Sequence, residues 1–215
     1  MPAVISPRLS RENIVAVAIE MADEAGLSSV TLRGIAERLA VHVTSLYNHV
    51  PTKEAVFEGV VEALIAEARL PTGRIGWQDW VRQFAAGMRA LGRKHPGAFE
   101  AFHHGPARGE RAAEPIEAGF AAFRAAGFDV PTTYSAVKAV TLSVLGHVLE
   151  DTVPQRNRKV ARTNIRELPV ERFPNAHALN RVAGKTDTFG YLIEVLIAGF
   201  EATRKARRPR KAVSD

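Results

Sequence analysis

The stretch TLRGIAERLAVHVTSLYNHVPTKEAV, residues 31–56, decides the fold of this chain. Its first part predicts a short helix that begins at Thr31, because a threonine hydroxyl can cap the free amides of a helix start. A break at residues 40–43 precedes a helix of one to two turns over residues 44–49, which Pro51 ends because the residue before a proline leaves helical geometry. Two short helices joined by a tight turn predict a helix-turn-helix. Its expected core residues are Ile35, Ala36, Leu39 and Leu46.

Longer helices are predicted on both sides of this motif. From Arg11 to Gly26 apolar residues recur every three or four positions, which places them on one helix face. Gly26 can adopt the left-handed conformation that closes such a helix. Thr52 can cap a further helix that runs to about Leu70 and carries a stripe of apolar residues.

The second half of the chain also carries helical patterns. They cover residues 77–94, 96–104, 111–126, 132–152 and 186–206. The segment from Val153 to Thr186 is predicted as an irregular, mobile loop with a short helix near Asn175–Val182. No stretch alternates like a strand over a useful length. The predicted fold class is therefore all-α, with an amino-terminal three-helix domain that holds the helix-turn-helix and a larger helical domain after it.

Composition and charge exclude several classes of protein. The chain has 215 residues, 46% of them hydrophobic, and no cysteine, which excludes disulfide frameworks, thiolate zinc sites and cysteine nucleophiles. We expect a cytoplasmic protein without a membrane partner, because no apolar run could span a bilayer and the start lacks a signal-peptide pattern. Residues 1–70 carry 6 basic and 9 acidic side chains, and residues 71–215 carry 23 and 14. The overall positive charge therefore does not by itself indicate nucleic-acid binding.

The local pattern around the short helices predicts contact with duplex DNA. The major groove of B-form DNA admits one helix, whose first turns face the base edges. Tyr47 and Lys53 can donate to phosphate oxygens, and Arg33 carries a planar donor group that can reach a guanine. The candidate DNA-binding residues are Thr31, Arg33, Val43, Thr44, Ser45, Tyr47, Asn48, His49 and Lys53. Structural alternatives stay open: Tyr47 could pack against the first helix, and Arg33 could be a solvated surface residue.

The stretch TLRGIAERLAVHVTSLYNHVPTKEAV resembles the DNA-binding domain of TetR-family transcriptional repressors, over about residues 11–57. Tyr47, two residues before His49 and six before Lys53, follows the pattern of that family. The chain departs from the pattern at Ala40, where the family usually has glycine, at His42, where it usually has a serine cap, and at Pro51, where it often has lysine. These changes bear on affinity and on the operator sequence.

The second half is similar to the regulatory domain of tetracycline repressors, through VLGHVLED at 144–151 and FGYLIEVLIAGFEATRK at 189–205. The predicted domains are residues 1–52 for the helix-turn-helix DNA-binding domain, 53–70 for a connecting helix, 71–206 for ligand binding and dimerisation, and 207–215 for a basic disordered tail. The resemblance implies a ligand-responsive regulator, most simply a repressor that binds a palindromic operator as a dimer and is released by a small molecule.

Two apolar helices supply material for the expected homodimer, which would read two half-sites. The resemblance implies a four-helix bundle between two chains; the alternative is a bundle within one chain. The candidate interface residues are Val137, Val140, Thr141, Val144, Val148, Leu192, Leu196 and Phe200.

A cavity for an unknown small-molecule effector is expected inside the larger domain. Its candidate lining residues are Phe84, Met88, Phe99, Phe102, His103, Phe123, Leu142 and Leu145. The alternative for this aromatic stripe is plain core. The resemblance to tetracycline repressors, which engage a metal-chelated drug, makes His103 and Glu150 weak metal candidates, but neither a metal nor a cofactor is expected.

Two other classes of function are considered. No G-x-S-x-G, H-E-x-x-H, glycine-rich phosphate loop or dinucleotide fingerprint occurs, so we do not expect an enzyme. A dimeric helical adaptor whose helix-turn-helix no longer binds DNA is the alternative function, because residues 1–70 are acidic overall and Pro51 removes one phosphate contact.

Overall fold

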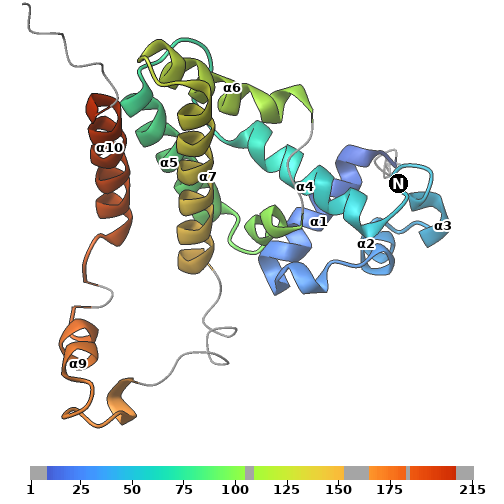
Figure 1. Ribbon diagram of the computed structural model, residues 1–215. Helices are drawn as coiled ribbons and strands as arrows, with labels where there is room; N and C mark the ends of the chain where they lie inside the picture. The colour runs from blue at the N-terminus through green and yellow to red at the C-terminus, as the bar shows by residue number, and fades with distance from the viewer. Residues whose placement is uncertain (1–8, 105–108, 153–164, 183–184, 207–215) are drawn as a thin grey trace, which may run out of the picture. The chain divides into compact units, whose positions relative to one another are not determined.

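The computed structural model describes residues 9–104, 109–152, 165–182 and 185–206 (Figure 1). The described residues form helices and no strand, which confirms the predicted all-α class. The helices are α1 (Arg11–Ala25), η1 (Leu27–Ser29), α2 (Leu32–Arg38), α3 (Val43–Leu46), α4 (Lys53–Glu67), α5 (Trp77–Lys94), η2 (Ala98–His103), α6 (Glu110–Ala125), α7 (Val130–Thr152), η3 (Ile165–Glu167), α9 (Pro174–Asn180) and α10 (Thr188–Ala206). The chain divides into two compact units, Met1–Val153 and Pro154–Asp215.

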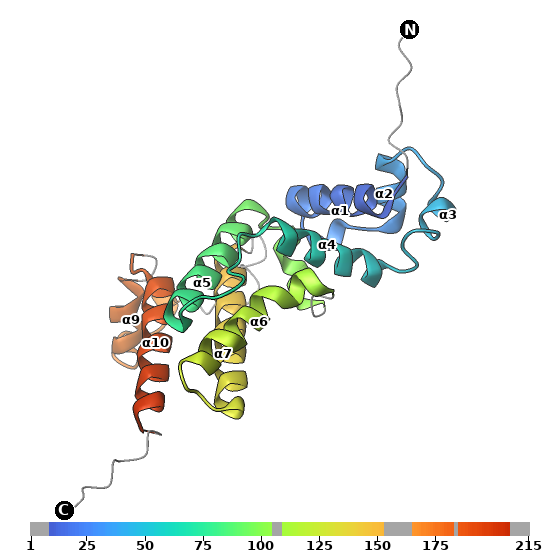
Figure 2. The same ribbon diagram turned by 90° about the horizontal axis from the view of Figure 1, so that it is seen from above.

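The amino-terminal helices of the first unit form where the sequence provides caps. Ser10 accepts a hydrogen bond from the amide of Asn13 at 3.2 Å and begins α1. Gly26, with φ +87°, ends this helix, as its sequence position predicted. Thr52 caps α4 by accepting from the amide of Ala55 at 3.1 Å. Helices α1 and α4 pack against each other (Figure 2), so the two short helices between them are held by a rigid frame.

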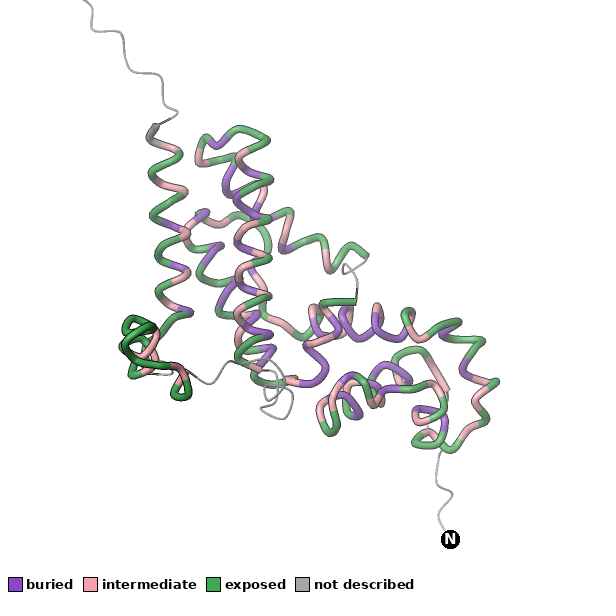
Figure 3. Tube along the Cα trace, turned by 60° about the horizontal axis from the view of Figure 1, so that its bottom comes forward, coloured by how far each residue is buried: buried purple, intermediate pink, exposed green. Residues whose placement is uncertain are grey.

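Helices α5, α6 and α7 pack pairwise in the rest of the first unit (Figure 1). Their core is aromatic: Trp80, Phe99 and Phe123 are fully buried, and Figure 3 shows buried positions recurring along these helices. The indole N–H of Trp80 donates to the carbonyl oxygen of Pro115 at 2.8 Å, which satisfies both buried groups. This hydrogen bond joins α5 to α6.

A polar junction joins α1, α4 and η2. One carboxylate oxygen of Asp23 accepts hydrogen bonds from the backbone N–H groups of Gly97 and Ala98, each at 3.0 Å. The other oxygen lies 2.6 Å from Nδ1 of His95, and Nε2 of His95 lies 3.2 Å from Glu67 on α4. Glu67 also pairs with Lys94 at 2.7 Å, and this hydrogen bond, followed by that from His95, holds the pKa of Glu67 below its usual value. The frame of the short helices is therefore bonded to the start of η2.

The second unit contains η3, α9 and α10. Within the segment predicted as a loop, the described residues form η3 and α9, and the short helix expected near 175–182 is α9. The predicted mobility of residues 153–164 and the predicted tail at 207–215 lie outside the described residues.

Some expectations differ from the structure in detail. Helix α4 ends at Glu67 rather than near Leu70, because Ala68 is extended ahead of Pro71. Residues 98–103 form a 3-10 helix, and Leu39, expected in the core, is only half-buried. Among the described residues, no helix combines the length and the apolar character that a membrane crossing requires.

Candidate nucleic-acid interface and internal cavity

Helix α3 is anchored on one side and exposed on the other. The anchors are Leu46 and Val50, both with 0% exposure. On the opposite side Tyr47 is 52% exposed, and Thr44, Asn48 and His49 are exposed as well. Tyr47 therefore does not belong to the core, and its contact with DNA stays a prediction. Residues 44–49 therefore present hydroxyl, amide and imidazole groups to solvent.

The turn before α3 shows the physical effect of two sequence departures. Ala40 has φ +53°, the left-handed region where glycine is preferred, and this conformation costs an alanine about 1 kcal/mol. His42 occupies the cap position of α3 without a side-chain hydrogen bond to a helix amide; its Nδ1 lies 2.9 Å from the hydroxyl of Thr44. The start of α3 is therefore held less firmly than a serine cap and a glycine turn would hold it.

The neighbouring helix starts hold the other predicted DNA-binding residues. Thr31 caps α2 by accepting from the amide of Gly34 at 3.0 Å. The side chain of Arg33 is 87% exposed and pairs with Glu37, one turn along α2, at 3.2 Å. The ammonium group of Lys53 lies 5.1 Å from the ring centre of Phe57. All nine predicted residues are exposed or half-buried, and α2 packs against α3.

The ion pairs around α3 leave cationic groups exposed. Arg38 pairs with Glu24, and this bond lowers the pKa of Glu24 and raises that of Arg38. The pKa of Glu54 is also lowered, first by a hydrogen bond with its own backbone amide at the start of α4 and then by one with Thr52. Both carboxylates are ionised at neutral pH. Of the three Lys and Arg side chains between Thr31 and Lys53, Arg38 is paired with Glu24, and Arg33 and Lys53 are the other two.

A cavity of about 410 Å³ lies among α4, α5, η2, α6 and α7 of the first unit. It is open to solvent, since its lining residues His103, Lys138 and Leu142 are exposed. Its lining residues are Ile65, Leu70, Phe84, Met88, Phe102, His103, Ala112, Pro115, Ile116, Lys138, Thr141, Leu142 and Leu145. Six of the eight residues predicted to bind a ligand line it. The other two, Phe99 and Phe123, do not: both have 0% exposure and belong to the core. Sequence reasoning missed Lys138, although its spacing from Thr141 and Leu142 puts it on the same face of α7.

The structure corrects part of the predicted dimer interface. Val137, Val140, Val144 and Val148 of α7 are at most 2% exposed, and Val148 packs directly on Gly92 of α5. These four residues are core residues of one chain, because their three- and four-residue spacing faces α5. Thr141 lines the cavity. Leu192, Leu196 and Phe200 lie half-buried on α10, and their contact with a partner stays a prediction.

The two weak metal candidates do not come together in one site. His103 lines the cavity, whereas Glu150 is exposed and is not among the lining residues. No group of three potential metal-ligating side chains occurs within the described ranges. The ring of the adjacent His104 packs against Phe57 of α4, with 5.0 Å between ring centres.

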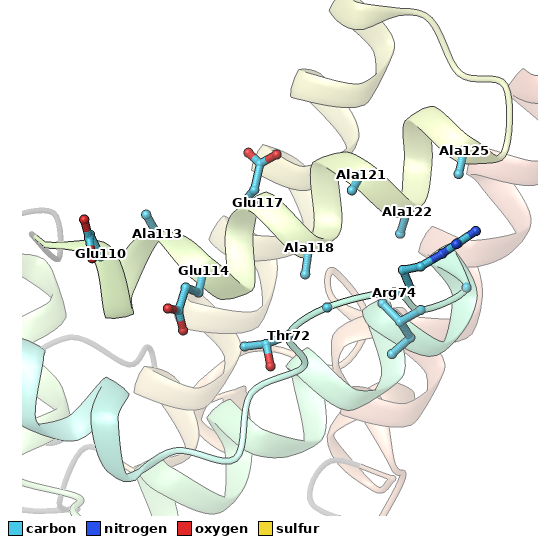
Figure 4. Close-up of a pocket in the computed structure, with 13 residues that line it drawn as sticks. Thr72, Arg74, Glu110, Ala113, Glu114, Glu117, Ala118, Ala121, Ala122 and Ala125 are labelled. Carbon is cyan, nitrogen blue, oxygen red and sulfur yellow. The ribbon is translucent and has the colours of Figure 1, made fainter.

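A larger hollow of about 1110 Å³ lies between residues 72–76 and α6 (Figure 4). Ala118 and Ala122 face residues 72–76, and Glu117 points away from them (Figure 4). No aromatic residue lines this hollow. Small-molecule sites in proteins are mostly apolar and aromatic, so the smaller cavity is the better candidate despite its size.

Comparison with known proteins identifies both halves of the chain. The family model described as "Bacterial regulatory proteins, tetR family" matches residues 14–60, and the one described as "Tetracyclin repressor-like, C-terminal domain" matches residues 70–204. The chain is 30% identical to the tetracycline repressor protein class D of Escherichia coli over 202 residues, 90% of each chain. It is 35% identical to an HTH-type transcriptional regulator of Saccharopolyspora erythraea over 148 residues, which are 68% of this chain and 63% of that relative. Among solved structures, apo ActR from Streptomyces coelicolor shares the fold, with a TM-score of 0.77, 21% identity and coverage of 93% of this chain and 98% of that one.

Proposed function

Because the chain belongs to the tetR family of bacterial transcriptional regulators, we propose that it is a repressor that binds a palindromic operator as a dimer and is released by a small molecule. The observation that carries the proposal is the exposed polar surface of α3 on a buried base of Leu46 and Val50. A repressor of this kind acts on DNA in the cytoplasm, which is therefore its proposed location. The family is one of regulators, not of enzymes.

The geometry of the short helices suits the major groove. One short helix fits this groove, and its exposed side chains then face the base edges and the flanking phosphates. Tyr47 and Lys53 supply donors for phosphate oxygens, which set the position of the helix. Arg33 supplies a planar donor group for one base, because 87% of its side chain is exposed and its ion pair with Glu37 is a surface pair.

A dimer follows from the size of the reading surface. One chain presents a few base-contacting residues and therefore discriminates few base pairs. Two chains double the contact and read half-sites about 34–36 Å apart. Since four valines of α7 are core residues, the partner contact falls to other faces of α7 and to α10.

Replacement of Arg33 by alanine tests the base-reading role. Arg33→Ala is expected to relax sequence preference at one position of each half-site, at a cost of roughly 1–3 kcal/mol for the preferred base. The measurement is a selection of bound duplexes from random DNA, with wild type and variant in parallel. Arg69→Ala, which removes an exposed arginine beyond the end of α4, is the control and should leave the preference unchanged.

An unchanged preference in Arg33→Ala contradicts the base contact. The adaptor alternative makes a different prediction for the same selection, because a protein whose helix-turn-helix has lost DNA enriches no sequence at all.

A chain of contacts connects the cavity with the DNA-binding surface. Helix η2 carries the cavity residues Phe102 and His103. The next residue, His104, packs on Phe57, and the ring of Phe57 lies beneath Lys53. An effector that displaces η2 therefore shifts the first turn of α4 and weakens its phosphate contact. This is coupling by differential affinity for two conformations.

The coupling is tested without an effector by filling the cavity. Leu145→Trp adds an indole to the cavity wall and is expected to lower DNA affinity about tenfold, a usual size for coupling between sites. In a His104→Ala background the same substitution should change DNA affinity much less, because the link to Phe57 is gone. DNA affinity is measured by fluorescence anisotropy, and melting curves confirm that each variant folds. Equal losses in both backgrounds contradict transmission through His104.

A further inference from the structure

One cation faces the otherwise apolar cavity. Among the lining residues, ten are apolar side chains, and Lys138, Thr141 and His103 are the polar ones. No carboxylate lines the cavity. Lys138 is exposed, so its ammonium group is hydrated when the cavity is empty, and an unpaired charge carries no burial cost there.

Within the described part of the chain, no carboxylate pairs with Lys138. Its neighbours three and four residues away on α7 are Tyr134, Ser135, Thr141 and Leu142, none of them acidic. On α6, which packs against α7, Glu114 and Glu117 line the other hollow (Figure 4). The ammonium group of Lys138 forms no ion pair and no hydrogen bond with the residues that the structure describes.

Thr141 is the second polar group on this face of α7. Its hydroxyl donates to the carbonyl oxygen of Val137 at 2.9 Å, so its hydrogen-bond donor is already used within the helix. Lys138 and Thr141 are three residues apart on one helix and lie on the same face. Of these two groups, Lys138 is therefore the one that offers a donor to an anionic oxygen of a ligand.

The rest of the cavity requires an apolar body. Phe84, Met88 and Phe102 form part of the wall, and the volume of about 410 Å³ is within the usual range for small-molecule sites. Entry of such a body removes water from around Lys138, which strengthens the attraction to an anion in the lower dielectric.

We propose that the effector is an apolar carboxylic acid whose carboxylate pairs with Lys138 and whose apolar body fills the cavity. This inference rests on the proposed function only in treating the cavity as the effector site.

The experiment measures direct binding by isothermal titration calorimetry and uses no DNA. The probes are 2-naphthoate and its neutral isostere 2-naphthamide, with decanoate as the linear alkyl acid. The proteins are the full-length chain, Lys138→Gln, and the control Arg93→Gln, which removes an exposed charge of α5 that does not line the cavity.

Wild type and Arg93→Gln are expected to bind naphthoate about tenfold more tightly than naphthamide, the usual value of a charge-assisted hydrogen bond. Lys138→Gln should lose this preference and keep its affinity for naphthamide. Whichever of naphthoate and decanoate binds more tightly indicates whether the apolar part of the effector is a fused ring or a linear chain. Either result supports a carboxylic acid as the effector. Equal affinity of wild type for acid and amide, a preference that persists in Lys138→Gln, or no binding of any acid overturns the proposal. A failure of the proposed repressor activity would instead appear as loss of operator binding, which this measurement does not involve.

Discussion

Lys53→Glu is expected to weaken operator binding about 100-fold, because a dimer loses two charge-assisted phosphate contacts of about 1.5 kcal/mol each. Lys53 is the first residue of α4. Its ammonium group lies over the ring of Phe57 and forms no ion pair with the residues that the structure describes. The fold should not suffer, since a carboxylate in the first turn of a helix interacts favourably with the helix dipole.

The measurement is fluorescence anisotropy with a selected operator duplex, accompanied by melting curves. Arg69→Glu changes the net charge equally at an exposed position beyond α4 and should retain most of the affinity. Equal losses in the two variants would mean that overall charge, rather than a contact by Lys53, controls binding. An unchanged affinity in Lys53→Glu would exclude the phosphate contact.

Gly97→Ala is expected to destabilise the protein by about 3 kcal/mol, the upper range for overpacking with loss of hydrogen bonds to a charged group. A Cβ atom at Gly97 would clash with the carbonyl oxygen of Ala22, and the three nearest atoms, from Ala22 and Asp23, all belong to the backbone. The backbone of Gly97, with φ −83° and ψ −42°, is open to alanine. The whole effect is therefore steric: η2 must move away from α1, which breaks its two amide hydrogen bonds to Asp23.

Chemical denaturation of the purified chain measures this loss. Gly146→Ala is the matched control, because no atom lies within 4 Å of a Cβ placed on Gly146 in α7, and alanine should stabilise a helix interior by up to about 1 kcal/mol. If Gly97→Ala is as stable as wild type, the close packing of η2 on α1 is wrong.

Local features of the fold could be predicted from the sequence because each depends on a few adjacent residues. Thr31 and Thr52 cap helices as their spacing indicated, and Gly26 ends α1 with a positive φ. The predicted DNA-binding residues likewise belong to one short stretch. A correct prediction of the helices in that stretch is therefore enough to place these residues near one another.

Features that join distant residues could not be predicted. Asp23, Glu67 and His95 are far apart in the chain, and no periodicity relates them. On α7, apolar residues occupy several faces, and a single sequence does not show which face packs on α5 and which lines a cavity. The sequence therefore predicts that the valines contact a partner and does not single out Lys138, because only tertiary packing distinguishes the faces of such a helix.

The salt dependence of operator binding tests the central claim, that α3 and the start of α4 contact duplex DNA, most directly. Wild-type chain is titrated into a selected duplex over a range of salt concentrations, with the stoichiometry determined at low salt. We predict two chains per duplex and a logarithm of affinity that falls linearly with the logarithm of salt, with a slope of about −2 or steeper, because Lys53 of each chain neutralises a phosphate. Affinity that does not change with salt, or no saturable binding to any selected duplex, would contradict the account.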